Sequence, residues 1–164
     1  MVKNVTGFDL SKLLAGSFGT LAAMTSVTVK VLPKPDKTRT VLLYGLDDEA
    51  AVKALSETLQ GPFEINSAAH LPANIAAKSA VSYIASSGGS VAAVRVQGPE
   101  PSVEVRCRAV RALWQAHGEV EELHGHNSEN LWQEVRDIAK LLSNPEDQIW
   151  RLSVPPSTGA GVVA

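Results

Sequence analysis

Residues 38–71 read TRTVLLYGLDDEAAVKALSETLQGPFEINSAAHL, and this stretch decides the fold class. Thr38 to Leu46 is rich in Val, Leu and Tyr and predicts a strand. Asp47 then caps a helix with apolar residues at helical spacing, and Gly61-Pro62 ends it. Because Phe63 to Leu71 predicts another strand, the stretch forms a strand, a helix and a strand.

The residues that follow extend this pattern. Val91 to Gln97 predicts a third strand, Ser102 to His117 a second long helix, and Glu119 to His124 a fourth strand. The order β-α-β-β-α-β is that of ferredoxin-like (split βαβ) folds. We therefore predict an α+β fold, with helices on one face of an antiparallel sheet. Asn74 to Ala85 predicts an inserted helix between the two central strands.

Residues beyond the fourth strand predict three more elements. Ser128 is expected to cap a helix that runs to Leu142 and stops at Pro145. Gln148 to Val154 predicts a fifth strand, and Pro155-Pro156-Ser157 resembles the start of a further helix.

Lys3 to Pro35 reads KNVTGFDLSKLLAGSFGTLAAMTSVTVKVLPKP. A short amphipathic helix at Asp9 to Leu14 leads into a Gly-Ser-Phe-Gly-Thr turn at 16–20, which precedes an alternating strand. Gly16 and Gly19 can take positive φ, and Ser17 and Thr20 add hydroxyl donors, so the turn suits a pyrophosphate. On local signal alone, a helix C-cap and loop is the commoner meaning of such a turn.

Three motifs in this segment resemble the end of the flavin domain in FAD-linked oxidases of the vanillyl-alcohol oxidase type. They are Gly7-Phe8-Asp9-Leu10, Gly16-Ser17-Phe18-Gly19-Thr20-Leu21 and Thr25-Ser26-Val27-Thr28. The resemblance implies FAD as cofactor, contacted by Gly16, Ser17, Gly19 and Thr20. Phe8 replaces the usual Tyr, and Ala22-Ala23 replace a Gly and a β-branched residue, which puts hydrogen bonds from position 8 in doubt.

The same resemblance implies a domain organisation and an activity. Residues 1–35 would be the C-terminal remnant of an FAD-binding domain, and residues 36–164 a ferredoxin-like cap or substrate domain truncated at its C-terminal end. Since the Gly-rich flavin loops of the family lie upstream, we expect a fragment that is inactive alone. The parent would be a flavoprotein oxidoreductase of a glycolate oxidase-like complex, acting with other subunits on a small 2-hydroxy acid by hydride transfer to FAD.

Two other functions are compatible with these residues. The ferredoxin-like unit could be a non-catalytic interaction or assembly module of a flavoprotein complex. It could also be a small-ligand regulatory domain, in which case Lys3 to Pro35 would pack on it as a hairpin arm.

Arginines are the candidates for binding a substrate carboxylate, because a guanidinium binds one bidentately. The candidates are Arg95, Arg106, Arg108, Arg111 and Arg151. Arg95 and Arg151 lie in predicted strands, whereas Arg108 and Arg111 are expected on a solvated helix face. No residue is assigned a catalytic role.

The other reactive side chains predict structure rather than chemistry. Cys107 lies on the apolar face of a predicted helix and is expected to be buried. His124-Gly125-His126-Asn127 has no third ligand at a recognisable spacing, so we assign no metal. The acidic run at 119–122 is expected to protect a sheet edge, and the three tryptophans are expected in the core.

Composition excludes some classes of protein. The 15 basic and 17 acidic residues are scattered, so no basic stripe predicts nucleic-acid binding. No apolar run approaches the roughly 20 residues of a membrane span, and no signal peptide opens the chain. The single cysteine is typical of a reducing compartment, and we expect a cytoplasmic protein.

Overall fold

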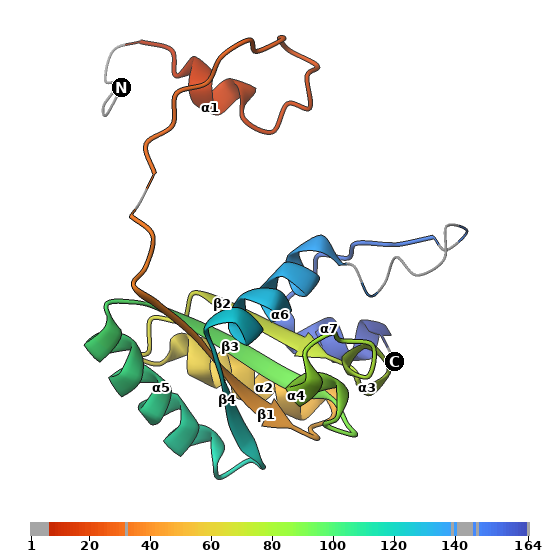
Figure 1. The fold of residues 1–164 in the computed structure, drawn as a ribbon. Helices are drawn as coiled ribbons and strands as arrows, with labels where there is room; N and C mark the ends of the chain where they lie inside the picture. The colour runs from red at the N-terminus through yellow and green to blue at the C-terminus, as the bar shows by residue number, and fades with distance from the viewer. Residues whose placement is uncertain (1–6, 32, 139, 141–145, 147, 164) are drawn as a thin grey trace. The chain divides into compact units, whose positions relative to one another are not determined.

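The structure is a computed structural model that describes residues 7–31, 33–138, 140, 146 and 148–163. The chain divides into two compact units, Met1–Lys34 and Pro35–Ala164. We call them the N-terminal segment and the C-terminal domain and describe each by itself (Figure 1).

The C-terminal domain is built on one antiparallel sheet of four strands. The strands are β1 (Lys37–Tyr44), β2 (Ser67–Leu71), β3 (Val91–Gly98) and β4 (Val120–His124). Their order in the sheet is β2-β3-β1-β4, and each neighbouring pair is antiparallel. This is the order of a split βαβ fold, so the predicted fold class is confirmed.

Two long helices, α2 (Asp48–Gln60) and α5 (Glu100–Trp114), pack on one face of this sheet (Figure 1). Asp47 caps α2 as predicted, because its side chain accepts a hydrogen bond of 2.8 Å from the Ala50 amide. The indole N–H of buried Trp114 donates to Thr58 Oγ1 at 2.7 Å, which joins α5 to α2. The core on this face contains Val41, Leu43, Ala51, Ala54, Leu55, Ala92, Val94, Val96, Val103, Cys107, Val110 and Trp114.

Helices also cover the opposite face, which the prediction of helices on one face did not include. They are α3 (Ala73–Ala76), α4 (Ser82–Ala85) and α6 (Gly125–Asp137). The core there contains Leu42, Leu71, Ala76, Val81, Ile84, Val91, Ala93, Leu123, Leu131 and Trp132. The central strands are apolar at consecutive positions, and successive side chains point to opposite faces, so both faces must be covered.

Several predicted boundaries were wrong. β2 begins at Ser67 rather than Phe63, and the helix predicted at 74–85 is two short helices, α3 and α4. α6 begins at Gly125, so Ser128 is not its cap but a buried residue within it. In the described residues α6 ends at Asp137, where Ile138 takes a left-handed φ of 46°. Leu142 and Pro145 lie outside the described residues.

The predicted fifth strand is also wrong. Residues 148–155 form neither helix nor strand, and Trp150 is 79% exposed rather than in the core. An alternating pattern forms a strand only where a neighbouring strand accepts its backbone hydrogen bonds. The helix expected from Pro156 is present as α7 (Pro156–Val163), which contacts α2.

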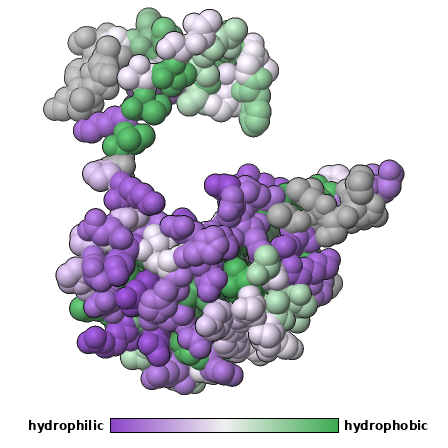
Figure 2. Space-filling model, in the orientation of Figure 1, coloured by the Kyte–Doolittle hydropathy of each residue, from purple (hydrophilic) through white to green (hydrophobic). Residues whose placement is uncertain are grey.

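The N-terminal segment has one helix, α1 (Leu10–Leu14), capped by Asp9. Residues 21–31 form no strand, which corrects the prediction for the alternating run after the turn. Apolar side chains of the segment face solvent: Phe8, Leu10, Leu13, Phe18, Leu21, Met24, Val27, Val29 and Val31. Figure 2 shows apolar surface spread over this segment, whereas the face of the C-terminal domain in view is mostly hydrophilic.

Candidate functional site

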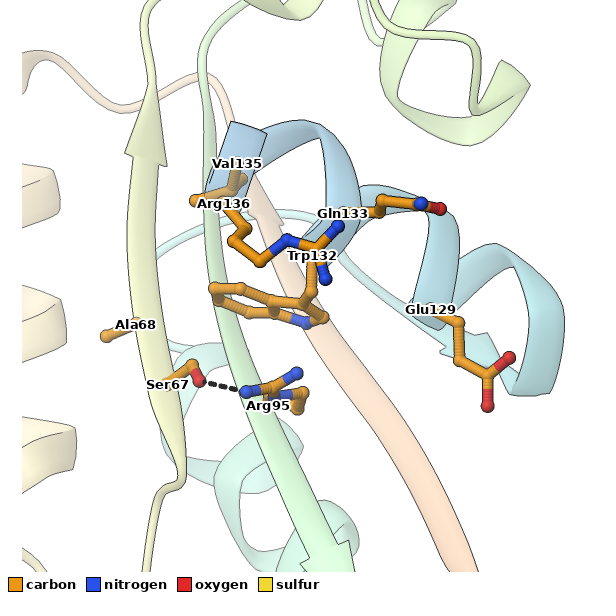
Figure 3. A pocket seen from close by; sticks show the side chains of 8 residues that line it. All are labelled: Ser67, Ala68, Arg95, Glu129, Trp132, Gln133, Val135 and Arg136. Atoms are coloured by element: carbon orange, nitrogen blue, oxygen red, sulfur yellow. Dashed lines mark hydrogen bonds between the residues drawn. The ribbon is translucent and has the colours of Figure 1, made fainter. Parts of the chain in front are cut away.

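A hollow of about 620 Å³ lies on the α6 side of the sheet, over β2 and β3 (Figure 3). Its walls come from two strands and one helix, because α6 crosses the sheet at this point. The lining residues are Ser67, Ala68, Arg95, Glu129, Trp132, Gln133, Val135 and Arg136.

A row of polar residues crosses three strands beneath Trp132, and two of its three members, Arg95 and Ser67, line the hollow. Arg95 of β3 pairs in register with Thr40 of β1 on one side and with Ser67 of β2 on the other. Residues directly opposite each other in antiparallel strands share a face, so the three side chains point toward α6. Arg95 Nη2 donates a hydrogen bond of 2.6 Å to Ser67 Oγ, which Figure 3 shows as a dashed line.

Trp132 of α6 covers this row. The guanidinium carbon of Arg95 lies 5.1 Å from the centre of the indole ring, within the range of a cation–π interaction. The indole N–H donates to Thr40 Oγ1 at 2.8 Å, and Thr40 Oγ1 and Ser128 Oγ are 2.7 Å apart. Because Trp132 is only 7% exposed, these contacts hold the ring in one orientation above Arg95.

Arg95 is a cation without a carboxylate partner in the described part of the chain. Its Nε is buried without a hydrogen-bond partner there, and its Nη2 is held by a neutral hydroxyl. Burial lowers the pKa of Arg95, yet an arginine keeps its proton in proteins. A partly desolvated guanidinium with no counter-ion favours an anionic ligand.

Two other charged residues line the hollow, Arg136 and Glu129, and both are less suited than Arg95 to bind an anion. Arg136 forms two hydrogen bonds to the Asp137 carboxylate, from Nε at 2.7 Å and from Nη2 at 2.9 Å. The hydrogen bond to Asp137 raises the pKa of Arg136, and the pKa of Asp137 is lowered by the same contact. Glu129 adds a negative charge, and Figure 3 shows its carboxylate turned away from Arg95.

A second, smaller hollow of about 140 Å³ continues along β2 and α6. Its lining residues are Ala69, His70, Leu71, Ile75, Glu134, Val135, Ile138 and Lys140. Glu134 accepts hydrogen bonds of 2.7 Å from Ser79 Oγ and from the Ala80 amide. These bonds tie α6 to the segment between α3 and α4, which keeps the helix in place beside both hollows.

The structure places the other predicted arginines elsewhere. Arg151 is exposed, lies in the irregular residues 148–155 and does not line either hollow. Arg106 donates to the Gln97 and Glu64 carbonyls at 2.8 and 3.1 Å, which is a structural role. Arg108 is exposed on α5, and Arg111 lies 3.5 Å from Glu122.

The remaining reactive groups are structural. Cys107 is fully buried, and burial raises the pKa of its thiol to about 12, which makes it a poor nucleophile. His124 lies 3.5 Å from Glu122, and His126 Nε2 is 3.0 Å from Asn130 Nδ2. Among the described residues, no group of three His, Cys, Asp or Glu side chains could hold a metal ion.

The turn proposed for flavin contacts fits a phosphate in part. Gly16 and Gly19 have φ of +81° and +77°, and a Cβ added at either would meet no other atom within 4 Å. Their backbone is therefore open to a ligand. The Thr20 hydroxyl, however, donates to the Ser17 carbonyl at 2.7 Å, so it is used within the turn. These residues could supply one side of a larger phosphate site.

Sequence reasoning singled out Arg95 as a candidate but did not single out the residues that surround it. Trp132 was expected to pack in the core, and Ser67 and Thr40 were not singled out. The sequence signal that could have indicated this helix face is the spacing of Ser128 and Trp132, which are four residues apart. Their partners Thr40, Arg95 and Ser67 become neighbours only through strand register.

No helix in the described part of the chain is long and apolar enough to cross a membrane.

Comparison with known proteins confirms the resemblance to FAD-linked oxidases. No family model matches the chain. It is 26% identical over 155 residues to the glycolate oxidase subunit GlcE of Escherichia coli (strain K12), covering 94% of this chain and 36% of that protein. Over 59 residues it is 37% identical to the glycolate oxidase subunit GlcD of Bacillus subtilis (strain 168). An FAD-linked oxidoreductase of Mycobacterium tuberculosis (strain ATCC 25618 / H37Rv) is 41% identical over 59 residues.

The chain spans only part of these relatives. It covers 36% of the E. coli protein, and each 59-residue match covers 36% of this chain and 13% of the relative. The similarity to the E. coli protein therefore includes nearly all of this chain, and the other two concern about a third of it.

Proposed function

We propose that this chain is part of an FAD-linked oxidoreductase, as a glycolate oxidase-like subunit that acts on a 2-hydroxy acid within a complex of several subunits. The observation that carries the proposal is the similarity to GlcE along 94% of the chain. The hollow over Arg95 supports it, because a 2-hydroxy acid carries the carboxylate that this guanidinium lacks.

In this proposal residues 1–35 are the end of an FAD-binding domain, and residues 36–164 are a cap or substrate domain. The backbone at Gly16 and Gly19, together with Ser17, would contact the FAD phosphates, and Thr20 would keep the turn closed. When bound, FAD would supply the oxidant, taking the C2 hydrogen of the substrate as hydride while the hydroxyl proton passes to water. The single Cys107 is compatible with a cytoplasmic location, which is part of the proposal.

The protein's part in the reaction would be to bind and orient the acid. Arg95 would hold the carboxylate, and Trp132 would keep the guanidinium in place and exclude water from one side of it. Arg151 stays a second candidate for carboxylate binding at an exposed position.

A chimera tests the proposal. The region of E. coli GlcE that aligns with this chain is replaced by residues 1–164, and the purified complex is assayed for bound FAD and glycolate-dependent dye reduction. We expect FAD to be retained in the chimera and lost when Gly16 and Gly19 are both changed to Val. The 164 residues alone are expected to bind no stoichiometric FAD. A folded chimera without FAD would contradict the proposal.

The exposed apolar residues of the N-terminal segment favour a second candidate, a non-catalytic assembly module of a flavoprotein complex. Changing Arg95 and Arg151 to Ala in the active chimera separates the two functions. A catalytic cap predicts a raised KM or a lowered kcat, whereas an assembly module predicts unchanged kinetics.

A further inference from the structure

The two hollows form one groove between the edge strand β2 and helix α6. Consecutive residues of β2 line them, Ser67 and Ala68 the larger and Ala69 to Leu71 the smaller, and Val135 of α6 lines both. The groove is therefore continuous along the strand, with the guanidinium of Arg95 toward one end.

The other end of the groove is apolar. Leu71, Ile75, Val135 and Ile138 contribute aliphatic side chains to the smaller hollow. Glu134 at its rim is engaged, because it accepts bonds from Ser79 and Ala80 and lies 3.4 Å from Lys140. His70 Nε2 lies 2.6 Å from Asp48 Oδ1, and only its buried Nδ1 has no hydrogen-bond partner among the described residues of this lining. A ligand in this end would therefore gain mainly from apolar contact.

The charged side chains around the larger hollow favour a ligand that carries one negative charge. Of the two guanidinium groups at the larger hollow, that of Arg136 is neutralised by Asp137, and only that of Arg95 lacks a carboxylate partner in the described chain. Glu129 lines the same hollow and would repel a second negative charge. A monocarboxylate fits this balance better than a phosphate dianion does.

Size argues against a two-carbon acid. Pockets of about 300–1,000 Å³ typically hold ligands much larger than glycolate, and the larger hollow alone measures about 620 Å³. An acid with an aliphatic chain could keep its carboxylate at Arg95 and place its carbon atoms along Val135.

We propose that the groove between β2 and α6 binds an aliphatic monocarboxylic acid longer than glycolate, with its carboxylate on Arg95 and its chain directed toward Ile138. As a statement about substrate class, that of an aliphatic 2-hydroxy acid, the inference rests on the proposed function. As a statement about binding, it requires no FAD and concerns the C-terminal domain alone.

The test uses NMR of the 164-residue chain. Each of the three tryptophans gives one indole N–H signal, and loss of a signal in Trp132→Phe identifies that of Trp132. The chain is titrated with 2-hydroxy-4-methylpentanoate, with glycolate and with the uncharged 4-methylpentanamide. We expect a saturable shift of the Trp132 signal, at least about tenfold tighter for the longer acid than for glycolate, and no shift with the amide.

Variants separate the two ends of the groove. Arg95→Gln and Arg95→Lys are expected to weaken binding of the longer acid at least about tenfold. Ile138→Asn should reduce the preference for the longer acid, and it suits the left-handed backbone at this position, so the fold should be retained. Arg108→Gln on α5 is the matched control and should bind like the parent chain.

Several outcomes would overturn the inference. They are equal affinity for glycolate and the longer acid, unchanged binding in a folded Arg95→Gln chain, and no saturable shift with either acid. Failure of the FAD chimera with groove binding intact would reject the proposed function but not the groove. A chimera that oxidises glycolate as efficiently as the longer acid would reject the substrate class alone.

Discussion

The N-terminal segment and the C-terminal domain both contain runs of apolar residues, but these runs differ in burial and in secondary structure. Val27, Val29 and Val31 alternate with polar residues and are exposed, and the chain forms no strand there. Val41, Leu42 and Leu43 of β1 are fully buried between two layers of helices. Among the described residues, strand-forming side chains are therefore found in a strand where other strands and helices complete their environment.

This difference in burial is also relevant to the function of each region. In the N-terminal segment, none of the described residues 7–31, 33 and 34 is buried, and Phe18 is 99% exposed. Apolar burial of the kind that stabilises a folded unit is therefore not found among them. The proposed place of this segment in an FAD-binding domain would supply the missing partner. The C-terminal domain has cores on both faces of its sheet, and its candidate site is built entirely from its own residues.

Changing a leucine to alanine should affect the free energy of unfolding very differently in the two regions, and this is the largest effect that we expect. Leu42→Ala leaves a cavity in the core and should lower the free energy of unfolding by about 2–5 kcal/mol. Leu13→Ala, at a residue that is 61% exposed, should change it by less than about 0.5 kcal/mol. Urea unfolding followed by circular dichroism measures both. Equal losses would show that the N-terminal segment is packed like a core.

Thr40→Val tests the polar contacts below Trp132. Val has nearly the shape of Thr but cannot accept the indole hydrogen bond or bond to Ser128. We expect a loss of about 1–3 kcal/mol in the free energy of unfolding. Thr38→Val is the control, since Thr38 accepts a bond from Gln97 in a partly exposed position, and its loss should stay below about 1 kcal/mol. A loss no larger than the control's would mean that the Trp132 contact contributes little.

Alkaline pH should destabilise the C-terminal domain selectively. Burial raises the pKa of Cys107 to about 12, and burial with Glu121 and Glu119 raises that of Tyr44 to about 12. The folded state keeps these protons after the unfolded chain, with ordinary values of 9.0 and 10.0, has lost them. Stability from these groups is therefore complete below pH 9 and falls as the pH rises toward 12.

The slope due to Cys107 should approach about 1.4 kcal/mol per pH unit, and partly buried Tyr44 should contribute less. Urea unfolding from about pH 8 to about pH 11 measures this slope. Cys107→Ala and Tyr44→Phe should each flatten it. Residues 1–34 contain neither Cys nor Tyr, so their removal should leave the slope unchanged. A slope that persists in both variants would assign it to other groups.

Removal of residues 1–34 should have the smallest effect on stability. Because the C-terminal domain has its own cores, we expect its free energy of unfolding to change by less than about 1 kcal/mol. Binding of a hydrophobic dye should decrease, because the exposed apolar residues of the segment are gone. A large loss of stability would show that the two regions depend on each other.

Prediction from the sequence succeeded where local signals were strong. The Asp47 cap, the apolar faces of α2 and α5 and the apolar runs of β1 and β3 predicted these elements. It failed at Gln148 to Val154 and at Val27 to Val31, where alternation is present but no partner strand pairs in the described residues. It also misplaced the start of α6, because Ser128 has the residue type of a cap but is buried against Thr40.

Of the residues in the candidate site, the sequence singled out one. The sequence singled out Arg95 as a cation in a strand, and that position was correct. It did not show that Arg151 would lie outside regular structure. Nor did it show that Arg95 would lie beside a hollow without a carboxylate partner among the described residues. Salt bridges and burial depend on residues distant in sequence, so residue type could not separate the two arginines.

The sequence by itself determined the order of elements, the apolar character of the central strands and the likeness of the first 35 residues to a flavin domain. These properties are local, since they depend on capping, periodicity and motif. Only the tertiary structure decided that Thr40, Arg95 and Ser67 form one row beneath Trp132, and that the groove joins a cation to an apolar end. Strand register and helix packing bring these residues together, and both are set by burial of the whole domain.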